Sequence, residues 1–222
     1  STGEAQENVS KAVVQQVAEF LTKGIIQFAV NAPSLSPEVL QVLRPHLMLA
    51  GKLGALAAQL TVEPPTEVIV QVVGEAGERE LKALTTAALR GVLAQHVDPS
   101  VNFVNAPSLA RERGIRVIES RAPDAADHTN SIMVRLRGAS RSTVVQGAVF
   151  GADTLRLTRI NDFRMEAVPE GYILMLNNRD VPGVVGRVGT LLGERNINIA
   201  GLELGREKVG GMALSLFHVD EP

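Results

Sequence analysis

The sequence predicts an α+β protein, and three features of its 222 residues carry that prediction. Apolar residues recur at helical spacing in several stretches of the first part of the chain. Runs that alternate apolar and polar residues, as β-strands do, follow one another between residues 115 and 162. The segment 172–220 then indicates strand, helix, strand, strand. We expect an α+β region with a largely antiparallel sheet, followed by an incomplete ferredoxin-like βαββ unit.

The helices are predicted from apolar periodicity and from the residues that start and stop them. A first helix begins at the cap residues Ser1 or Thr2 and ends at Gly24. A linker rich in proline and serine begins at Asn31. A second helix is expected over residues 38–60, with Pro45 as a kink or a restart. A third covers residues 78–97.

The strands are predicted from alternation. The first is expected over residues 66–76, followed after the third helix by a short strand at 101–106 and a short helix at 108–114. The order of elements favours a mostly antiparallel meander over repeated βαβ units. Its strands are expected at 115–122, 130–138, 142–151 and 153–162.

The end of the chain is predicted to be three quarters of a ferredoxin-like βαββαβ fold. Strands are expected at 172–178, 197–205 and 212–220, with a helix at 183–195. The helix and strand that would complete such a fold do not follow. The "YILML" strand (residues 172–176) is therefore expected at an exposed or swapped edge of its sheet.

Composition excludes several classes of function. Apolar residues make up 45%, charged residues 21%, and the net charge is −2. Neither nucleic acid nor a membrane is expected as a partner, and a cytoplasmic location fits. The absence of cysteine excludes disulfides and thiolate metal sites, and the histidines lack metal-ligand spacing. A hydrolase would need a nucleophile, and neither cysteine nor a Gly-x-Ser-x-Gly motif is present.

The stretch "NNRDVPGVVGRVGTLLGERNINIAG" has the residue types that bind a free amino acid. We expect Asp180 near the N-cap, Pro182 in the first helical turn and Gly183 where the backbone approaches a ligand. The helix start attracts a carboxylate, Asp180 accepts from an ammonium, and asparagine amides serve either end. The alternative is that Asn177, Asn178 and Asp180 only cap and turn the chain.

Three glycines lie inside this predicted helix. Gly186, Gly189 and Gly193 each cost about 1 kcal/mol of helix propensity relative to alanine. They lack the Gly-x-Gly start of a dinucleotide-binding turn. We therefore expect them to allow close packing of the helix on the sheet rather than to bind phosphate.

Several stretches, in this order, resemble the C-terminal part of long, regulated D-3-phosphoglycerate dehydrogenases. They are "STGEAQENV", "VNFVNAPSLARERGI", "GAVFGADTLRLTRIND" and the amino-acid-binding stretch above. The resemblance implies a helix from the end of the catalytic domain (1–30), an intervening, allosteric substrate-binding domain (31–168) and a C-terminally truncated ACT regulatory domain (169–222). It also implies that the catalytic histidine and the NAD-binding domain lie upstream. The chain alone is therefore expected to be inactive and to hold no cofactor.

The resemblance implies L-serine, the end product of the pathway, as an allosteric effector. The residues that match its binding positions lie around the strand end and the helix, with Asn198 expected to reach across a dimer interface. A homo-oligomer formed through the ACT and intervening domains is implied. The alternative is an oligomerisation module whose ligand pocket is vestigial. The implied contacts are Asn178, Asp180, Val181, Pro182, Gly183, Val184 and Asn198.

Some relatives bind phosphate or a phosphorylated substrate such as 3-phosphoglycerate beside the intervening domain. The matching strands here offer Arg156, Arg159 and Arg164, whose guanidinium groups suit phosphate oxygens. This chain is shorter between Asn161 and Phe163 than the family pattern, and Glu166 stands where an arginine would help. Solvated strand faces are the alternative.

Overall fold

The computed structural model describes residues 8–14, 18, 37–96, 100–122 and 130–221. These fall into two compact units, residues 1–44 and 45–222. Residues 8–14 are helical, and the rest of the predicted first helix, like the linker that begins at Asn31, lies largely outside the described residues. The predicted second helix is a single α2 (Pro37–Leu60), which continues through Pro45 without a restart.

The larger sheet is six-stranded, in the order β2-β1-β3-β4-β5-β6. All its neighbours pair antiparallel except β1 and β2, which are parallel because two helices connect them. The largely antiparallel sheet is thus confirmed, and its first connection is a βαβ crossover. The strands are β1 (Glu67–Val73), β2 (Arg116–Ala122), β3 (Ser131–Arg137), β4 (Ser142–Phe150), β5 (Thr154–Ile160) and β6 (Phe163–Ala167).

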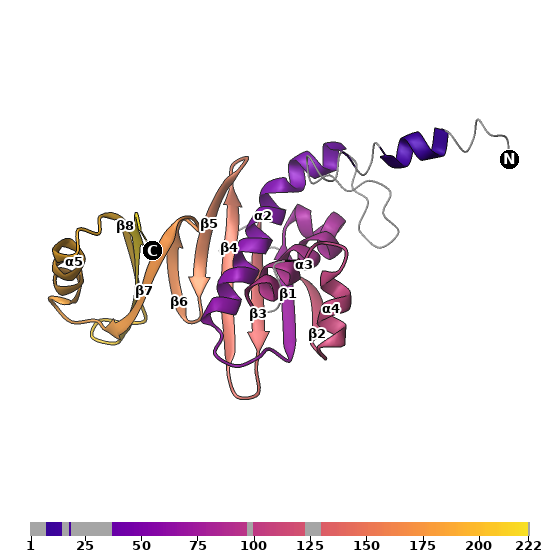
Figure 1. The fold of residues 1–222 in the computed structure, drawn as a ribbon. Coiled ribbons are helices and arrows are strands. Elements are labelled where there is room, and N and C mark those ends of the chain that lie inside the picture. Colours follow the sequence, from indigo (N-terminus) through magenta and orange to yellow (C-terminus); the bar gives the residue numbers. More distant parts are fainter. Residues whose placement is uncertain (1–7, 15–17, 19–36, 97–99, 123–129, 222) are drawn as a thin grey trace. The chain divides into compact units, whose positions relative to one another are not determined.

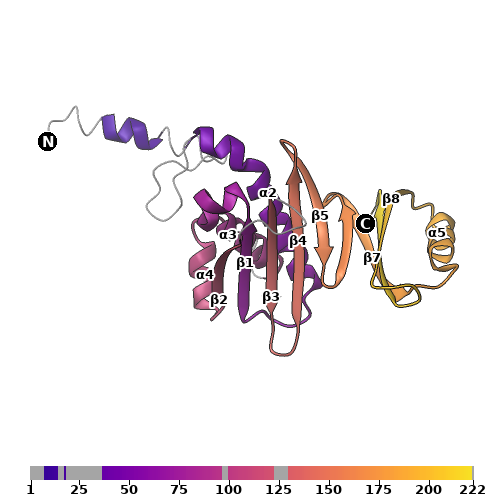
Figure 2. The ribbon, with the colours of Figure 1, turned by 180° about the vertical axis from the view of Figure 1, so that it is seen from behind.

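The helices of this region cover one face of the sheet. Figure 1 shows α2 and α3 (Glu75–His96) over the strands, and Figure 2 shows no described helix over the opposite face. Alternation explains the choice of face: Val68, Val70 and Val72 of β1 are 0%, 0% and 1% exposed. The main core therefore lies between α2, α3 and the sheet.

Glycines let α2 and α3 approach closely. A Cβ added at Gly54 would lie 2.1 Å from the carbonyl oxygen of Ala88. One added at Gly91 would lie 2.1 Å from the carbonyl oxygen of Gly51. Alanine at either position would force the two backbones apart, so this close contact requires glycine, which has no side chain, at both positions.

The strand predicted at residues 101–106 is wrong. The segment turns and leads into the short helix α4 (Ala106–Glu112). Asn102 Oδ1 accepts the N–H groups of Val104 and Asn105, and Asn105 Oδ1 accepts the N–H of Asn102 at 2.7 Å. Two asparagine side chains thus bond the backbone groups that a strand would have paired with a neighbour.

The C-terminal segment forms the predicted βαββ unit. Its three-stranded antiparallel sheet has the order β7-β9-β8, so β7 lies at an edge of the described sheet, as expected. Helix α5 (Val184–Glu194) follows β7. The strands are β7 (Tyr172–Arg179), β8 (Ile199–Arg206) and β9 (Met212–Val219).

The two faces of this smaller sheet differ. On one face a Cβ added at Gly205 would lie 2.8 Å from the carbonyl oxygen of Arg164, so β8 approaches the backbone of β6 there. On the other face, the side chains of Leu174, Leu202 and Leu204 remain 43%, 40% and 44% exposed. These half-exposed leucines on the two outer strands, β7 and β8, contribute to an apolar surface on that face.

None of the described helices is long and apolar enough to cross a membrane. Within the same described ranges, no three histidine, aspartate or glutamate side chains are grouped so that they could hold a metal ion.

Candidate amino-acid site at the start of helix α5

The turn between β7 and α5 differs in detail from the prediction. The N-cap is Gly183, not Asp180, and its φ of +88° is in the region that favours glycine. Pro182 precedes this cap instead of lying in the first helical turn. No side chain bonds the N-cap position, and the first turn contains no acidic residue. The start of α5 therefore keeps its electropositive character uncompensated by the side chains of its own first turn.

Asp180 is held beside this turn by two contacts. Its N–H donates to the carbonyl oxygen of Gly211 at 2.9 Å. Its Oδ2 accepts from Nη1 of Arg206 at 3.1 Å, and its side chain is 22% exposed. The carboxylate predicted to receive an ammonium group thus already has one cation beside it, while its Oδ1 accepts no hydrogen bond from the described residues.

Asn178 contributes an unused acceptor. Its Nδ2 donates to the carbonyl oxygen of Arg179 at 2.6 Å, whereas its Oδ1 is buried and has no hydrogen-bond partner. A buried amide oxygen without a donor costs free energy unless a ligand or water supplies one. Of the predicted site residues, Asn178 is the one with a buried side-chain acceptor that lacks a donor.

The remaining residues of the turn are open to solvent. Val181 is 48% exposed, Pro182 is exposed and Val184 is half-buried. A Cβ at Gly183 would lie 3.1 Å from Nη1 of Arg187, so that guanidinium lies over the helix start and adds to its positive charge. A shallow hollow of about 500 Å³ extends from Gly183 along the exposed side of α5 as far as Glu194.

Asn198 lies far from the rest of the predicted site. It precedes β8 at the end of the sheet where Ile199 and Tyr172 both pair with Val219, whereas Asp180 follows the opposite end of β7. The seven steps between the eight residues of β7, at about 3.4 Å each, separate those ends by roughly 24 Å. Its Nδ2 donates to Asp220 Oδ2 at 2.8 Å. Within one chain, the seven predicted contact residues do not form a single site.

The expectation that glycines allow close packing of α5 is wrong for two of the three. A Cβ at Gly186 or Gly193 would meet nothing within 4 Å, and one at Gly189 would touch only Cδ1 of Ile199 at 4.0 Å. Helix α5 packs through other residues, and Leu192 is buried. The structure offers no packing reason for Gly186 or Gly193.

The arginines proposed for anion binding have partners in the chain. As alternation predicts, Arg156 is partly exposed between the buried Leu155 and Leu157. Its Nε lies 3.7 Å from Glu166 Oε1, and its Nη1 donates to the carbonyl oxygen of Leu155. The nearby acid therefore already neutralises part of the charge that an anion would use.

The other two arginines are cross-strand neighbours. Arg159 pairs with Arg164 across β5 and β6, so their side chains share a face. Arg159 also donates to the carbonyl oxygen of Asn161 and lies 3.9 Å from Asp162. Asn161, at φ +50°, forms the tight turn between the strands. Arg164 also interacts with another group of the protein, so none of the three arginines is without a partner.

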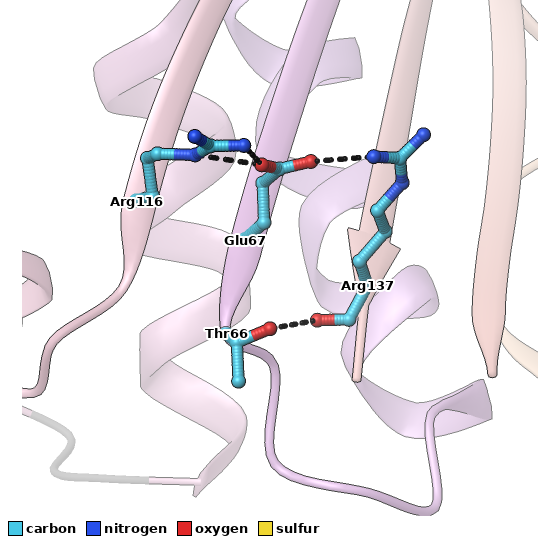
Figure 3. Close-up of polar contacts among 4 residues, drawn as sticks. All are labelled: Thr66, Glu67, Arg116 and Arg137. Atoms are coloured by element: carbon cyan, nitrogen blue, oxygen red, sulfur yellow. Dashed lines mark hydrogen bonds and ion pairs between the residues drawn. The ribbon is translucent and has the colours of Figure 1, made fainter. Parts of the chain in front are cut away.

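One polar cluster was missed by the sequence analysis. Figure 3 shows Glu67 of β1 between Arg116 of β2 and Arg137 of β3. Arg116 donates from Nε at 2.7 Å and from Nη2 to Oε2, and Arg137 donates from Nη1 to Oε1 at 3.1 Å. The hydrogen bond from Arg116 lowers the pKa of Glu67, and both guanidinium charges add to this effect. Only the strand register brings the three together.

Comparison with known proteins agrees with this architecture. Residues 42–161 match the model of the D-3-phosphoglycerate dehydrogenase intervening domain, and residues 172–222 match the ACT domain. The chain belongs to the D-3-phosphoglycerate dehydrogenase family. It contains the intervening and ACT regions of that family: the first match includes strands β1 to β5, and the second includes β7, β8 and β9.

Curated relatives extend the match over the whole chain. It is 37% identical to a D-3-phosphoglycerate dehydrogenase of Synechocystis over 100% of its length, and 34% identical to that of Bacillus subtilis over 99%. The protein from Archaeoglobus fulgidus is 33% identical over 100%. The chain covers 40%, 42% and 42% of these relatives. It therefore spans about two fifths of the length of these relatives.

Proposed function

We propose that this chain is the regulatory region of an NAD-dependent D-3-phosphoglycerate dehydrogenase and that its ACT domain senses L-serine for feedback inhibition. The proposal assigns hydride transfer, the catalytic histidine and NAD to parts of the enzyme outside residues 1–222, and a cytoplasmic location. It keeps the domain limits 1–30, 31–168 and 169–222.

The observation that carries the serine proposal is the buried Oδ1 of Asn178 without a donor. An amino acid supplies donors through its ammonium and, for serine, its hydroxyl. The start of α5, which no side chain caps, attracts the carboxylate, and Asp180 offers a second anion for the ammonium. The chemistry of the turn thus matches each end of the ligand.

The position of Asn198 supports a dimeric site. Because it lies at the opposite end of the sheet from Asp180, a ligand that touches both needs Asn198 from a second copy of the chain. Serine would then join two subunits and favour one of their arrangements. In that arrangement the distant catalytic cleft would turn over more slowly.

Calorimetry tests this proposal. L-serine is titrated at millimolar concentration into the full-length protein that contains this region, with D-serine as the stereochemical control. We expect heat with L-serine that Asn178→Ala abolishes. Asn177→Ala is the matched control, because Asn177 is an exposed neighbour on the same strand, and it should retain the heat. No heat with the unmodified protein would contradict serine sensing.

A second candidate function is assembly alone. It is favoured by the half-exposed side chains of Leu174, Leu202 and Leu204 and by the edge position of β7. It is also favoured by the ion pair between Arg206 and Asp180, which already engages that carboxylate. The region would then join subunits with a vestigial ligand pocket. Sedimentation of the full-length protein separates the two candidates, since an assembly module associates equally with and without serine.

The anion proposal for Arg156, Arg159 and Arg164 rests on their place on neighbouring strands. The acidic partners of Arg156 and Arg159, which are Glu166 and Asp162, lower the expected affinity for phosphate or 3-phosphoglycerate. If the site binds phosphate, Glu166→Gln should strengthen binding, because it removes the carboxylate beside Arg156. Unchanged binding in that variant would place the phosphate elsewhere.

A further inference from the structure

A pocket of about 500 Å³ lies in the intervening domain, where three segments of the chain meet. One wall is the loop from Thr61 to Pro65 after α2, the floor is Val92 and Leu93 of α3, and the far wall is formed by Arg113 and Ile115 after α4. We call it the Pro64 pocket. It lies in a different sheet region from the turn before α5, and its volume suits a small organic molecule.

The loop wall is fixed in place. Thr61 Oγ1 donates to the carbonyl oxygen of Ala57 at 2.7 Å and is bonded to Thr143 Oγ1 at 2.9 Å. Glu63 accepts the N–H of Ser140 at 2.9 Å and also its hydroxyl. Two successive prolines, Pro64 and Pro65, restrict the backbone between these anchors. The pocket is therefore preformed, which lowers the entropic cost of binding.

Its lining is mostly apolar. Val92 and Leu93 are 1% and 2% exposed and form a rigid floor from the protein core. Val62 at the rim is 86% exposed. An aliphatic group in the pocket would pack against this already buried floor and would remove the exposed apolar surface of Val62 from water.

Arg113 is the uncommitted polar side chain of this lining. It is exposed and has no side-chain hydrogen bond or ion pair with any described residue. The other polar side chains, Thr61 and Glu63, are bonded within the protein. The two bonds from Ser140, with the charge of Arg141, lower the pKa of Glu63. Glu63 therefore stays ionised at neutral pH, and its carboxylate is hydrogen-bonded to the β3–β4 hairpin rather than to Arg113.

We propose that the Pro64 pocket binds a small carboxylic acid with a branched aliphatic body. The carboxylate pairs with the guanidinium of Arg113, which suits it in a two-point arrangement. The aliphatic body lies over Val92, Leu93 and Ile115. Because Glu63 connects this wall to Ser140, the β3–β4 hairpin would report occupancy. This inference is independent of serine binding at the ACT domain.

Isovalerate is a suitable probe, and its neutral isostere isovaleramide is the control. Methyl and amide NMR spectra of the full-length protein are recorded at millimolar concentrations of each. We expect isovalerate to shift the methyl signals of Val62, Val92, Leu93 and Ile115 and the amide of Ser140. Isovaleramide should bind more weakly, by up to about fivefold, because it cannot form the charge pair with the exposed Arg113.

Arg113→Gln should weaken isovalerate binding by the same factor and leave isovaleramide unchanged. Arg111→Gln is the matched control: Arg111 is an exposed arginine two residues away that does not line the pocket, and its loss should change neither. The proposal is overturned if isovalerate shifts none of these signals. It is equally overturned if isovaleramide binds as well as the acid, or if Arg113→Gln and Arg111→Gln have equal effects.

Discussion

Arg206 donates from Nη1 to Oδ2 of Asp180 at 3.1 Å, across the turn where an amino acid is proposed to bind. The ligand's ammonium group must therefore share this carboxylate with a guanidinium. A half-exposed pair of this kind contributes less than about 1 kcal/mol to stability. The ion pair is thus weak enough for a ligand to rearrange it.

Asp180→Asn should weaken L-serine binding at least about tenfold, since a hydrogen bond to a charged group contributes about 1.5–3 kcal/mol. In the intact enzyme the same change should relieve serine inhibition and leave kcat largely unchanged. Titration calorimetry and initial rates measure the two effects. Arg206→Gln breaks the same ion pair but keeps the carboxylate, so it should retain binding. Equal losses in both variants, or a collapse of kcat, would make Asp180 structural.

Gly54→Ala should destabilise the protein by about 1–3 kcal/mol, because the new Cβ would lie 2.1 Å from the backbone of Ala88. Neither backbone can retreat without opening the α2–α3 contact. Gly186→Ala is the matched control inside a helix. Its Cβ meets nothing, so it should stabilise α5 by up to about 1 kcal/mol. Urea unfolding measures both, and a neutral Gly54→Ala would contradict the close approach.

The periodic elements of the fold were predictable from sequence. Alternation and helical spacing gave the main strands and helices, including the βαββ unit. The failures lie where local chemistry or pairing decides. Side-chain bonds from Asn102 and Asn105 turned a strand-like segment into a turn. The parallel pairing of β1 with β2 depends on the edge of the sheet to which the helical crossover returns the chain. Apolar periodicity carries no information about that edge.

For the residues of the candidate site, the position in a strand or turn was predictable from sequence, but their hydrogen-bond and ion-pair partners were not. Asn178 and Asp180 lie at the strand end and turn as expected. Arg206, 26 residues from Asp180 in the sequence, is brought beside it because β7 and β8 both pair with β9. The positive φ of Gly183 moved the N-cap three residues beyond Asp180. Contacts that depend on strand register or on a single backbone angle cannot be predicted from the order of residues in the sequence.

Gly205→Ala should also be destabilising, by about 1–3 kcal/mol, because its Cβ would lie 2.8 Å from the carbonyl oxygen of Arg164. The change separates β8 from β6 and should appear as a lower midpoint of thermal unfolding. Gly201→Ala, on the same strand, is the control. Its Cβ would meet His218 no closer than 3.6 Å, an ordinary contact. If both variants unfold alike, β8 does not depend on this approach to β6.

Glu67 should make stability depend on pH in the acid range. Its side chain is 7% exposed, and the hydrogen bond from Arg116, aided by the charge of Arg137, lowers its pKa from the ordinary 4.5. A carboxyl group whose pKa is lower in the folded state stabilises it fully above the unfolded pKa. This contribution is lost as the pH falls below about 4.5 toward the folded pKa. Urea unfolding at neutral pH and at successively lower pH measures it.

Glu67→Gln should reduce the free energy of unfolding at neutral pH, because both guanidinium groups lose their anion. It should also flatten the decline in stability below pH 4.5, since the titrating group is gone. Glu119→Gln on β2 is the matched control, because that carboxylate is exposed, and its variant should keep the decline. If Glu67→Gln shows the same acid profile as the unmodified protein, the cluster of Glu67, Arg116 and Arg137 does not govern acid stability.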